Sequence, residues 1–156
     1  ILDLGATTTW ETEKALELDQ SLCHPWTSHP LPFLLRQVLG VSPASPGFRT
    51  FSVRVNPMDL TSARGKVVTP KGPIRVSWQK QAAELVLELA VPSGTTAHGT
   101  PPLGWQRANV MLALDASPVT LQPLPVADGS FATRIELAVS VPAGRHRLRF
   151  VRTSRD

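Results

Sequence analysis

The hydrophobic pattern of the chain changes near residue 41. In residues 31–39, apolar side chains recur at the i, i+3, i+4, i+7 spacing of an amphipathic helix. They are Leu31, Leu34, Leu35 and Val38. Pro30 and Pro32 stand at the start of this stretch, where a missing backbone N–H costs nothing, and Gly40 can end it in a left-handed conformation. The pattern predicts one helix of about ten residues.

Beyond residue 47 the period becomes two, and short runs of alternating apolar and polar residues are separated by Pro, Gly and Asn turn signals. The runs cover residues 51–55, 74–78, 85–91, 109–114, 135–141 and 148–150. Short strands with one apolar face predict a mainly β fold, an antiparallel β-sandwich. The sequence VSPASPG at 41–47 is the expected linker, and residues 94–104 are the expected flexible loop.

Length and composition fit this organisation. With 156 residues the chain can form one domain or one and a half, too little for a complete helical barrel. Its 42% hydrophobic and 18% charged residues indicate a globular protein rather than a disordered one, and 15 prolines and 10 glycines suit many short strands joined by turns.

The positive charge of the chain is local. The formal net charge is +4 and the pI is about 10.0, with an excess of arginine near the C-terminus. The arginines are Arg145, Arg147, Arg149, Arg152 and Arg155. They could bind a polyanion, or they could keep an exposed strand edge soluble. We favour the second interpretation and expect no nucleic-acid partner, because no RNP-like, zinc-knuckle or helix-turn-helix motif accompanies the arginines.

The single cysteine, Cys23, permits no intrachain disulfide. No apolar run approaches the ~20 residues that span a bilayer, so no membrane partner is expected. The chain begins with Ile1 rather than Met and is therefore expected to be a piece of a longer product. The absence of a visible signal peptide then says little, and cytoplasmic and secreted locations both stay open.

Cofactor and thiol chemistry find no support in the sequence. His29, His98 and His146 lack the spacing of metal ligands, and no Gly-rich phosphate loop is present, so no metal or cofactor is expected. Cys23 beside His24 lacks an orienting Asn or Asp for a thiol nucleophile and is expected to be a small buried residue.

The stretch most suggestive of chemistry is 5–26, GATTTWETEKALELDQSLCHPW. Gly and Ala allow close backbone approach, threonine hydroxyls orient a ligand, and tryptophan offers a flat face. Glu11 and His24 are its central titratable groups. This mixture suits a sugar ring, which has an apolar face for stacking and a rim of hydroxyls for hydrogen bonds.

The order of several motifs resembles a known family. The motifs are GATTTWE, SLCHPW, FLLRQVLGV, PGF, VRVNPMDL and ARGKVVTPKGPIRVSW. In this order they resemble the C-terminal end of bacterial-type α-L-rhamnosidases of glycoside hydrolase family 78, densely up to Trp78 and more loosely beyond. The resemblance implies an incomplete terminal segment of an (α/α)6 catalytic barrel at 1–40, a linker at 41–47 and a C-terminal β-sandwich domain at 48–156.

The resemblance also implies roles for four residues. Glu11 corresponds to the general base of an inverting glycosidase, although a solvated helix-end carboxylate is the alternative. His24 would hydrogen-bond sugar hydroxyls from the pocket wall, or else anchor the start of the helix. Trp10 and Trp26 would bind the substrate by stacking, or be core aromatics, with Trp10 the better candidate.

The function implied is that of a C-terminal fragment of an α-L-rhamnosidase-like inverting glycoside hydrolase acting on terminal α-L-rhamnosyl linkages. The family's general acid lies upstream of these motifs, so the isolated chain is predicted to be inactive. The implied partners are a rhamnose-containing oligosaccharide or glycoside and the remainder of the barrel. Self-association through residues 1–39 is expected, since barrel helices without neighbours expose apolar surface.

The alternative is a non-catalytic β-sandwich module for structural support or carbohydrate binding. Such a module would need an exposed aromatic platform. Trp78 is expected in the sandwich core, and Trp105 could be in either environment. A weaker third possibility is polyanion binding by the C-terminal arginines.

Overall fold

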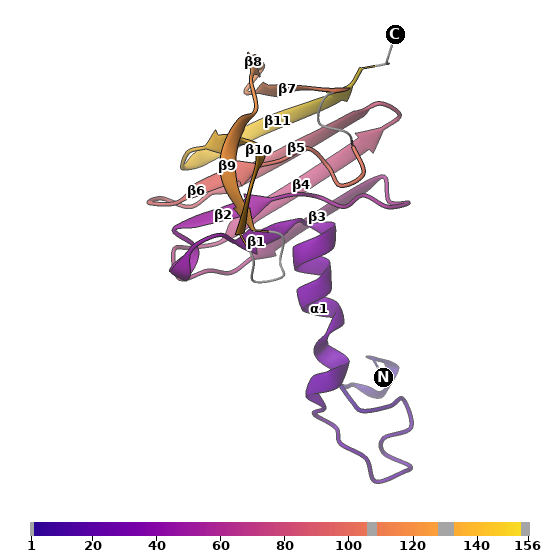
Figure 1. Cartoon of the computed structure of the whole chain (residues 1–156). Coiled ribbons are helices and arrows are strands. Elements are labelled where there is room, and N and C mark those ends of the chain that lie inside the picture. The colour runs from indigo at the N-terminus through magenta and orange to yellow at the C-terminus, as the bar shows by residue number, and fades with distance from the viewer. Residues whose placement is uncertain (1, 106–108, 128–132, 154–156) are drawn as a thin grey trace. The chain divides into compact units, whose positions relative to one another are not determined.

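A computed structural model describes residues 2–105, 109–127 and 133–153 (Figure 1). The chain divides into two compact units, Ile1–Leu34 and Leu35–Asp156. In the described part of the chain, no helix is long and apolar enough to cross a membrane.

The first unit contains little regular structure. It has the 3-10 turns η1 (Leu2–Leu4) and η2 (Pro25–Ser28) and the helical turn α1 (Pro30–Phe33). The chain continues from α1 into the π-helical turn η3 (Leu34–Val38), so a helix occupies the stretch predicted from the leucine spacing. Gly40 follows with a φ of 78° in the left-handed region, as expected for a helix end.

The second unit is built from two sheets. One has the order β1-β2-β6-β10-β9, in which β2 and β6 are parallel and the other pairs antiparallel. Its strands are β1 (Val41–Pro43), β2 (Thr50–Val53), β6 (Thr96–Gly99), β9 (Gln122–Ala127) and β10 (Thr133–Val141). The turn η4 (Pro46–Phe48) connects β1 and β2.

The other sheet is antiparallel throughout, in the order β3-β4-β5-β11-β7-β8. Its strands are β3 (Ser62–Val67), β4 (Ile74–Gln81), β5 (Glu84–Val91), β7 (Val110–Leu114), β8 (Ser117–Val119) and β11 (Gly144–Arg152). The two sheets share one apolar core, to which β2 contributes Phe51, β4 Trp78 and β11 Phe150. The predicted mainly β sandwich is confirmed.

Trp78 is a central residue of this core. It is 1% exposed, and its indole Nε1–H donates to the backbone carbonyl of Val38 at 2.8 Å. The end of the predicted helix is thereby fixed to β4 within the second unit. Leu39, next in the chain, is also buried.

The expected linker at 41–47 carries secondary structure. Val41–Pro43 forms β1, with Val41 opposite Val53 of β2, and Val41 and Ser42 are both buried. Pro46 and Gly47 lie in the turn η4. The two prolines of this segment suggested a linker, but Pro43 ends a short edge strand, where proline is tolerated, and Pro46 begins the turn η4.

The expected flexible loop at 94–104 was a wrong prediction, because its residues 96–99 form the internal strand β6. The strand lacks large apolar residues. A Cβ on Gly99 would lie 2.6 Å from a methyl group of Leu148 in the opposite sheet, so close approach of the sheets requires a small residue here. His98, 6% exposed, binds the Pro125 carbonyl of β9 through Nδ1 at 2.6 Å.

The described arginines near the C-terminus belong to β11. At Arg149 this strand is paired on both sides, with β5 and with β7, whereas Arg145 and Arg147 precede the part that is paired with β7. Leu148 and Phe150 point into the core, whereas Arg147 and Arg149 are exposed on the outer face. Arg155 lies outside the described residues.

Candidate functional site

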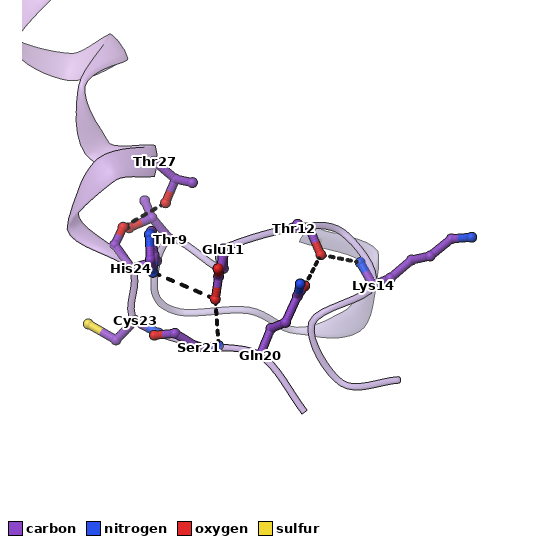
Figure 2. A network of polar contacts seen from close by, with 9 residues as sticks. All are labelled: Thr9, Glu11, Thr12, Lys14, Gln20, Ser21, Cys23, His24 and Thr27. Carbon is purple, nitrogen blue, oxygen red and sulfur yellow. Dashed lines mark hydrogen bonds and ion pairs between the residues drawn. The ribbon is translucent and has the colours of Figure 1, made fainter. Parts of the chain in front are cut away.

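The two motifs GATTTWE and SLCHPW lie side by side in the first unit (Figure 2). The backbone N–H of Glu11 donates to the Ser21 carbonyl at 2.9 Å, and that of His24 donates to the Thr9 carbonyl at 2.7 Å. The Thr9 hydroxyl donates in turn to the His24 carbonyl at 3.2 Å, and the Thr8 hydroxyl donates to the Leu22 carbonyl. These bonds fix the two segments against each other, so their side chains meet.

Glu11 and His24 are the titratable groups brought together by this pairing. The Glu11 Oε2 atom lies 3.8 Å from His24 Nδ1 and accepts a hydrogen bond from the Ser21 backbone N–H at 3.1 Å. The Glu11 side chain is 37% exposed and the His24 side chain 28%. One carboxylate oxygen is therefore held in place while the group remains open to solvent.

Residues 12–20 form a closed loop between the two motifs. The Thr12 hydroxyl donates to Gln20 Oε1 at 2.6 Å and accepts the Lys14 backbone N–H at 3.2 Å. The Gln20 backbone N–H donates to the Ala15 carbonyl at 2.9 Å, and Ala15 is 1% exposed. The loop thus brings Glu11 and Ser21 together across ten positions of sequence.

The two tryptophans of the site differ in exposure. Trp10 is 7% exposed and Trp26 is 75% exposed. Trp26 lies near His29, with ring centroids 6.1 Å apart. A stacking platform needs an open ring face, so Trp26 is the accessible indole, whereas the sequence favoured Trp10.

Cys23 is exposed, which contradicts the expectation of a small buried residue. Its backbone N–H donates to the Ser21 hydroxyl at 3.3 Å, and its sulfur points away from the Glu11 carboxylate (Figure 2). The hydrogen bonds of the turn are made by the backbone, and they leave the thiol at the surface.

The cluster has the parts of a water-activating site. A carboxylate held by a backbone N–H can accept a proton from water, and a neighbouring imidazole can bind a hydroxyl group. Among the described residues, no second carboxyl group is hydrogen-bonded to Glu11 or His24.

Sequence reasoning missed a second feature, which lies in the second unit. The outer face of the β3-β4-β5-β11 sheet holds a depression of about 710 Å³. Cationic residues line it, together with the acidic residues Glu88 and Asp115. The signal in the sequence was the alternation of Arg64, Lys66 and Arg75 with inward-facing residues, which becomes meaningful only once the strands are ordered.

The tryptophans of the second unit offer no open platform. Trp78 is buried in the core. Trp105 is half-buried, and the guanidinium of Arg152 lies 4.8 Å from its ring centroid. The aromatic residues expected to support carbohydrate binding by the sandwich are therefore occupied by packing.

Comparison with known sequences connects the chain to one family. Residues 40–110 match the model of the bacterial α-L-rhamnosidase C-terminal domain. An α-L-rhamnosidase of Streptomyces avermitilis is 29% identical over 106 residues, 62% of this chain and 10% of the relative. One of Alteromonas sp. (strain LOR) is 33% identical over 110 residues, 63% of this chain and 12% of the relative. The chain thus spans about a tenth of these relatives.

Solved structures share the fold. A Streptomyces avermitilis α-L-rhamnosidase complexed with L-rhamnose matches 95% of this chain and 14% of its own, with a TM-score of 0.63 and 24% identity. The α-L-rhamnosidase from Dictyoglumus thermophilum matches 97% of this chain and 17% of its own, with a TM-score of 0.69 and 19% identity. The family match, the relatives and the shared fold together confirm what the motifs predicted, that this chain corresponds to the C-terminal region of α-L-rhamnosidases.

Proposed function

We propose that this chain is the C-terminal part of an inverting α-L-rhamnosidase-like hydrolase in which Glu11 is the general base. The observation that carries the proposal is the Glu11 carboxylate, held by the Ser21 backbone N–H at 3.1 Å and lying 3.8 Å from His24 Nδ1. The names of the relatives supply the sugar, α-L-rhamnose.

In an inverting hydrolase, two carboxyl groups stand on opposite sides of the sugar, about 6.5–9.5 Å apart, to leave room for a water molecule. Glu11 removes a proton from this water as its oxygen attacks the anomeric carbon. An acid on the opposite side protonates the departing oxygen as the glycosidic bond breaks. The hydrogen bond from Ser21 orients one carboxylate oxygen and leaves the other to face the water.

His24 and Trp26 would position the sugar. The backbone N–H of His24 is bound to Thr9, and its carbonyl accepts the Thr27 hydroxyl at 2.7 Å, so the residue is anchored on both sides. Its imidazole can then bind a ring hydroxyl. Trp26 offers the open aromatic face that an apolar sugar face can stack on.

The isolated chain is proposed to be inactive because it lacks the acid. A base alone leaves a poor alkoxide leaving group, and general acid catalysis contributes about 10²–10⁴-fold to such reactions. We expect the purified chain to release no rhamnose from methyl α-L-rhamnopyranoside, because its alkoxide leaving group must be protonated as it departs. Measurable release of rhamnose would contradict this part of the proposal.

The base assignment is tested in a protein that contains this chain together with the upstream barrel. Glu11→Gln should lower kcat about 10²–10⁴-fold. Glu13→Gln is the matched control, because Glu13 is exposed and two residues away, and it should leave kcat unchanged. Equal losses in both variants would show that the effect is not specific to Glu11.

Chemical rescue separates a general base from a structural carboxylate. In Glu11→Ala, added azide can attack the anomeric carbon without base assistance, and the product would be a rhamnosyl azide of inverted, β configuration. NMR of the product identifies the anomer. Retention of the α configuration, or no response to azide in a correctly folded variant, would refute the proposed role.

A further inference from the structure

The outer face of the second sheet carries a concentration of positive charge. Five cationic side chains line the depression there, contributed by β3, β4 and β11, together with the acidic residues Glu88 and Asp115. The cations are Arg64, Lys66, Arg75, Arg145 and Arg147. Five positive and two negative groups leave an excess of three positive charges over the depression.

Strand register arranges these residues in two rows. In one row, Lys66 is opposite Arg75, Arg75 opposite Ala90, and Ala90 opposite Arg145. In the adjacent row the corresponding order is Arg64, Ser77, Glu88 and Arg147. Neighbouring strands lie about 4.8 Å apart and alternate residues of a strand about 6.8 Å apart, so the charges form a compact grid.

The cations of this grid form no close ion pair with another described residue. In the part that the structure describes, none of the five makes an ion pair within 4 Å. Arg149, one position further along the same face of β11, is paired with Glu84, its Nη2 lying 2.8 Å from Oε2. Asp115 is engaged by the Arg147 backbone N–H at 2.8 Å and His146 Nδ1 at 2.7 Å.

The arrangement costs the fold stability. Lys66 and Arg75 are like charges directly opposite each other on paired strands, a placement that destabilises a sheet. Cations scattered over the surface, or paired with acidic residues, would keep the protein as soluble as this grid does. The unpaired grid is explained if an anionic ligand supplies the missing negative charge.

We propose that this face binds an acidic polysaccharide whose sugars carry carboxylates. Arginine guanidinium groups bind carboxylates through two parallel hydrogen bonds. Glu88 and Ser77, within the grid, can pair with sugar hydroxyls, which donate as well as accept. A uronic acid presents both kinds of group on each ring.

Nucleic acid fits the same face less well. Its backbone offers mainly phosphate acceptors, which the Glu88 carboxylate would repel. Single strands are held by stacking on aromatic rings, and the residues lining the depression include no Phe, Tyr or Trp. This inference goes beyond the proposed hydrolase and does not involve Glu11, so either can fail without the other.

The test is binding of the whole chain to polygalacturonate, measured by affinity electrophoresis and by calorimetry at low salt. Neutral dextran is the ligand control, and duplex DNA is the competing polyanion. The site variant is Arg75→Gln with Arg145→Gln. The matched control is Arg49→Gln with Lys71→Gln, which removes the same charge from exposed residues outside the depression.

We expect binding to polygalacturonate and none to dextran. The site variant should weaken binding about tenfold or more, because charge-assisted hydrogen bonds are lost, whereas the control should change it about twofold or less. Arg75→Lys with Arg145→Lys should recover part of the affinity, since charge is kept without the guanidinium fork. Circular dichroism of every variant verifies the fold.

Three results would overturn the inference. The first is no retention of the chain by polygalacturonate. The second is equal weakening in the site and control variants, which indicates unspecific attraction. The third is binding to duplex DNA as tight as to polygalacturonate.

Discussion

Replacing Gly40 by alanine tests how closely the end of the helix approaches the sandwich. Gly40 has a φ of 78°, and a Cβ built on it would lie 2.2 Å from both the carbonyl carbon and the carbonyl oxygen of Arg54. Two backbone hydrogen bonds run beside it, from Arg54 N–H to the Gly40 carbonyl at 2.9 Å and from Asn56 N–H to the Gln37 carbonyl at 3.0 Å. A methyl group cannot fit without separating these segments.

The expected cost has two parts. A left-handed conformation costs alanine roughly 1–2 kcal/mol, offset by about 0.4–1 kcal/mol from the lower entropy of the unfolded chain. The steric part adds about 1–3 kcal/mol for overpacking and about 1 kcal/mol for each backbone hydrogen bond that is lost. We therefore expect Gly40→Ala to lower the free energy of unfolding by about 3 kcal/mol or more, a large part of the ~5–15 kcal/mol typical of a domain.

Gly47→Ala is the matched control. Gly47 has a similar φ of 68°, but a Cβ there would meet nothing within 4 Å. Only the conformational part applies, which is about 0–1.6 kcal/mol after the offset. Urea unfolding followed by circular dichroism of the strands measures both variants. If the two differ by less than about 0.5 kcal/mol, the close approach of Gly40 to Arg54 is not real.

Three further predictions concern the core, an acidic side chain and the first unit. Trp78→Phe should cost about 2–4 kcal/mol in urea unfolding, because it leaves a gap and an unpaired Val38 carbonyl; a change below about 0.5 kcal/mol would refute the buried hydrogen bond. The backbone N–H of Arg147 is the main cause that lowers the pKa of Asp115 in the folded protein, so the unfolded state takes up this proton first as the pH falls. The free energy of unfolding should therefore decline below about pH 4, and it should decline less steeply in Asp115→Asn than in the unchanged protein. Equal slopes for the two proteins would contradict this linkage. Exposed apolar residues in the first unit should drive self-association, which Phe33→Ser should weaken in sedimentation velocity; a monomer at high concentration would argue against it.

The sequence predicted the strands whose apolar residues are large. Alternation in β4, β5 and β11 reflects direct packing into the core, since Trp78, Leu87 and Phe150 are all nearly inaccessible. The strand β6 carries no such signal, because the close approach of Leu148 to Gly99 selects small side chains. A hydrophobic pattern reveals strands that fill the core with large apolar side chains. It misses strands whose small side chains allow the two sheets to approach closely.

The sequence could predict which residues of the candidate site lie together, but not how exposed its tryptophan side chains are. The motifs placed Glu11 and His24 in one site, and the backbone bonds between the two segments bring these side chains within 3.8 Å. Whether an indole is buried depends on tertiary packing, which the spacing of residues in the sequence does not encode. Both tryptophans were candidates for stacking, with Trp10 the better one, but Trp10 is 7% exposed and Trp26 is 75% exposed.

The charge of β11 shows why a sequence alone could not locate the cationic face. Arginine at every second position indicates that one face of a strand is basic, but an edge strand and a central strand can have the same sequence pattern. The difference lies in the neighbours, and here β5 brings Arg75 of β4 into the same row as Arg145, seventy positions later in the chain. Charges that are dispersed in sequence thus converge on three strands of one surface. A polyanion meeting this surface would interact with several cations at once, which isolated arginines on a sheet edge could not provide.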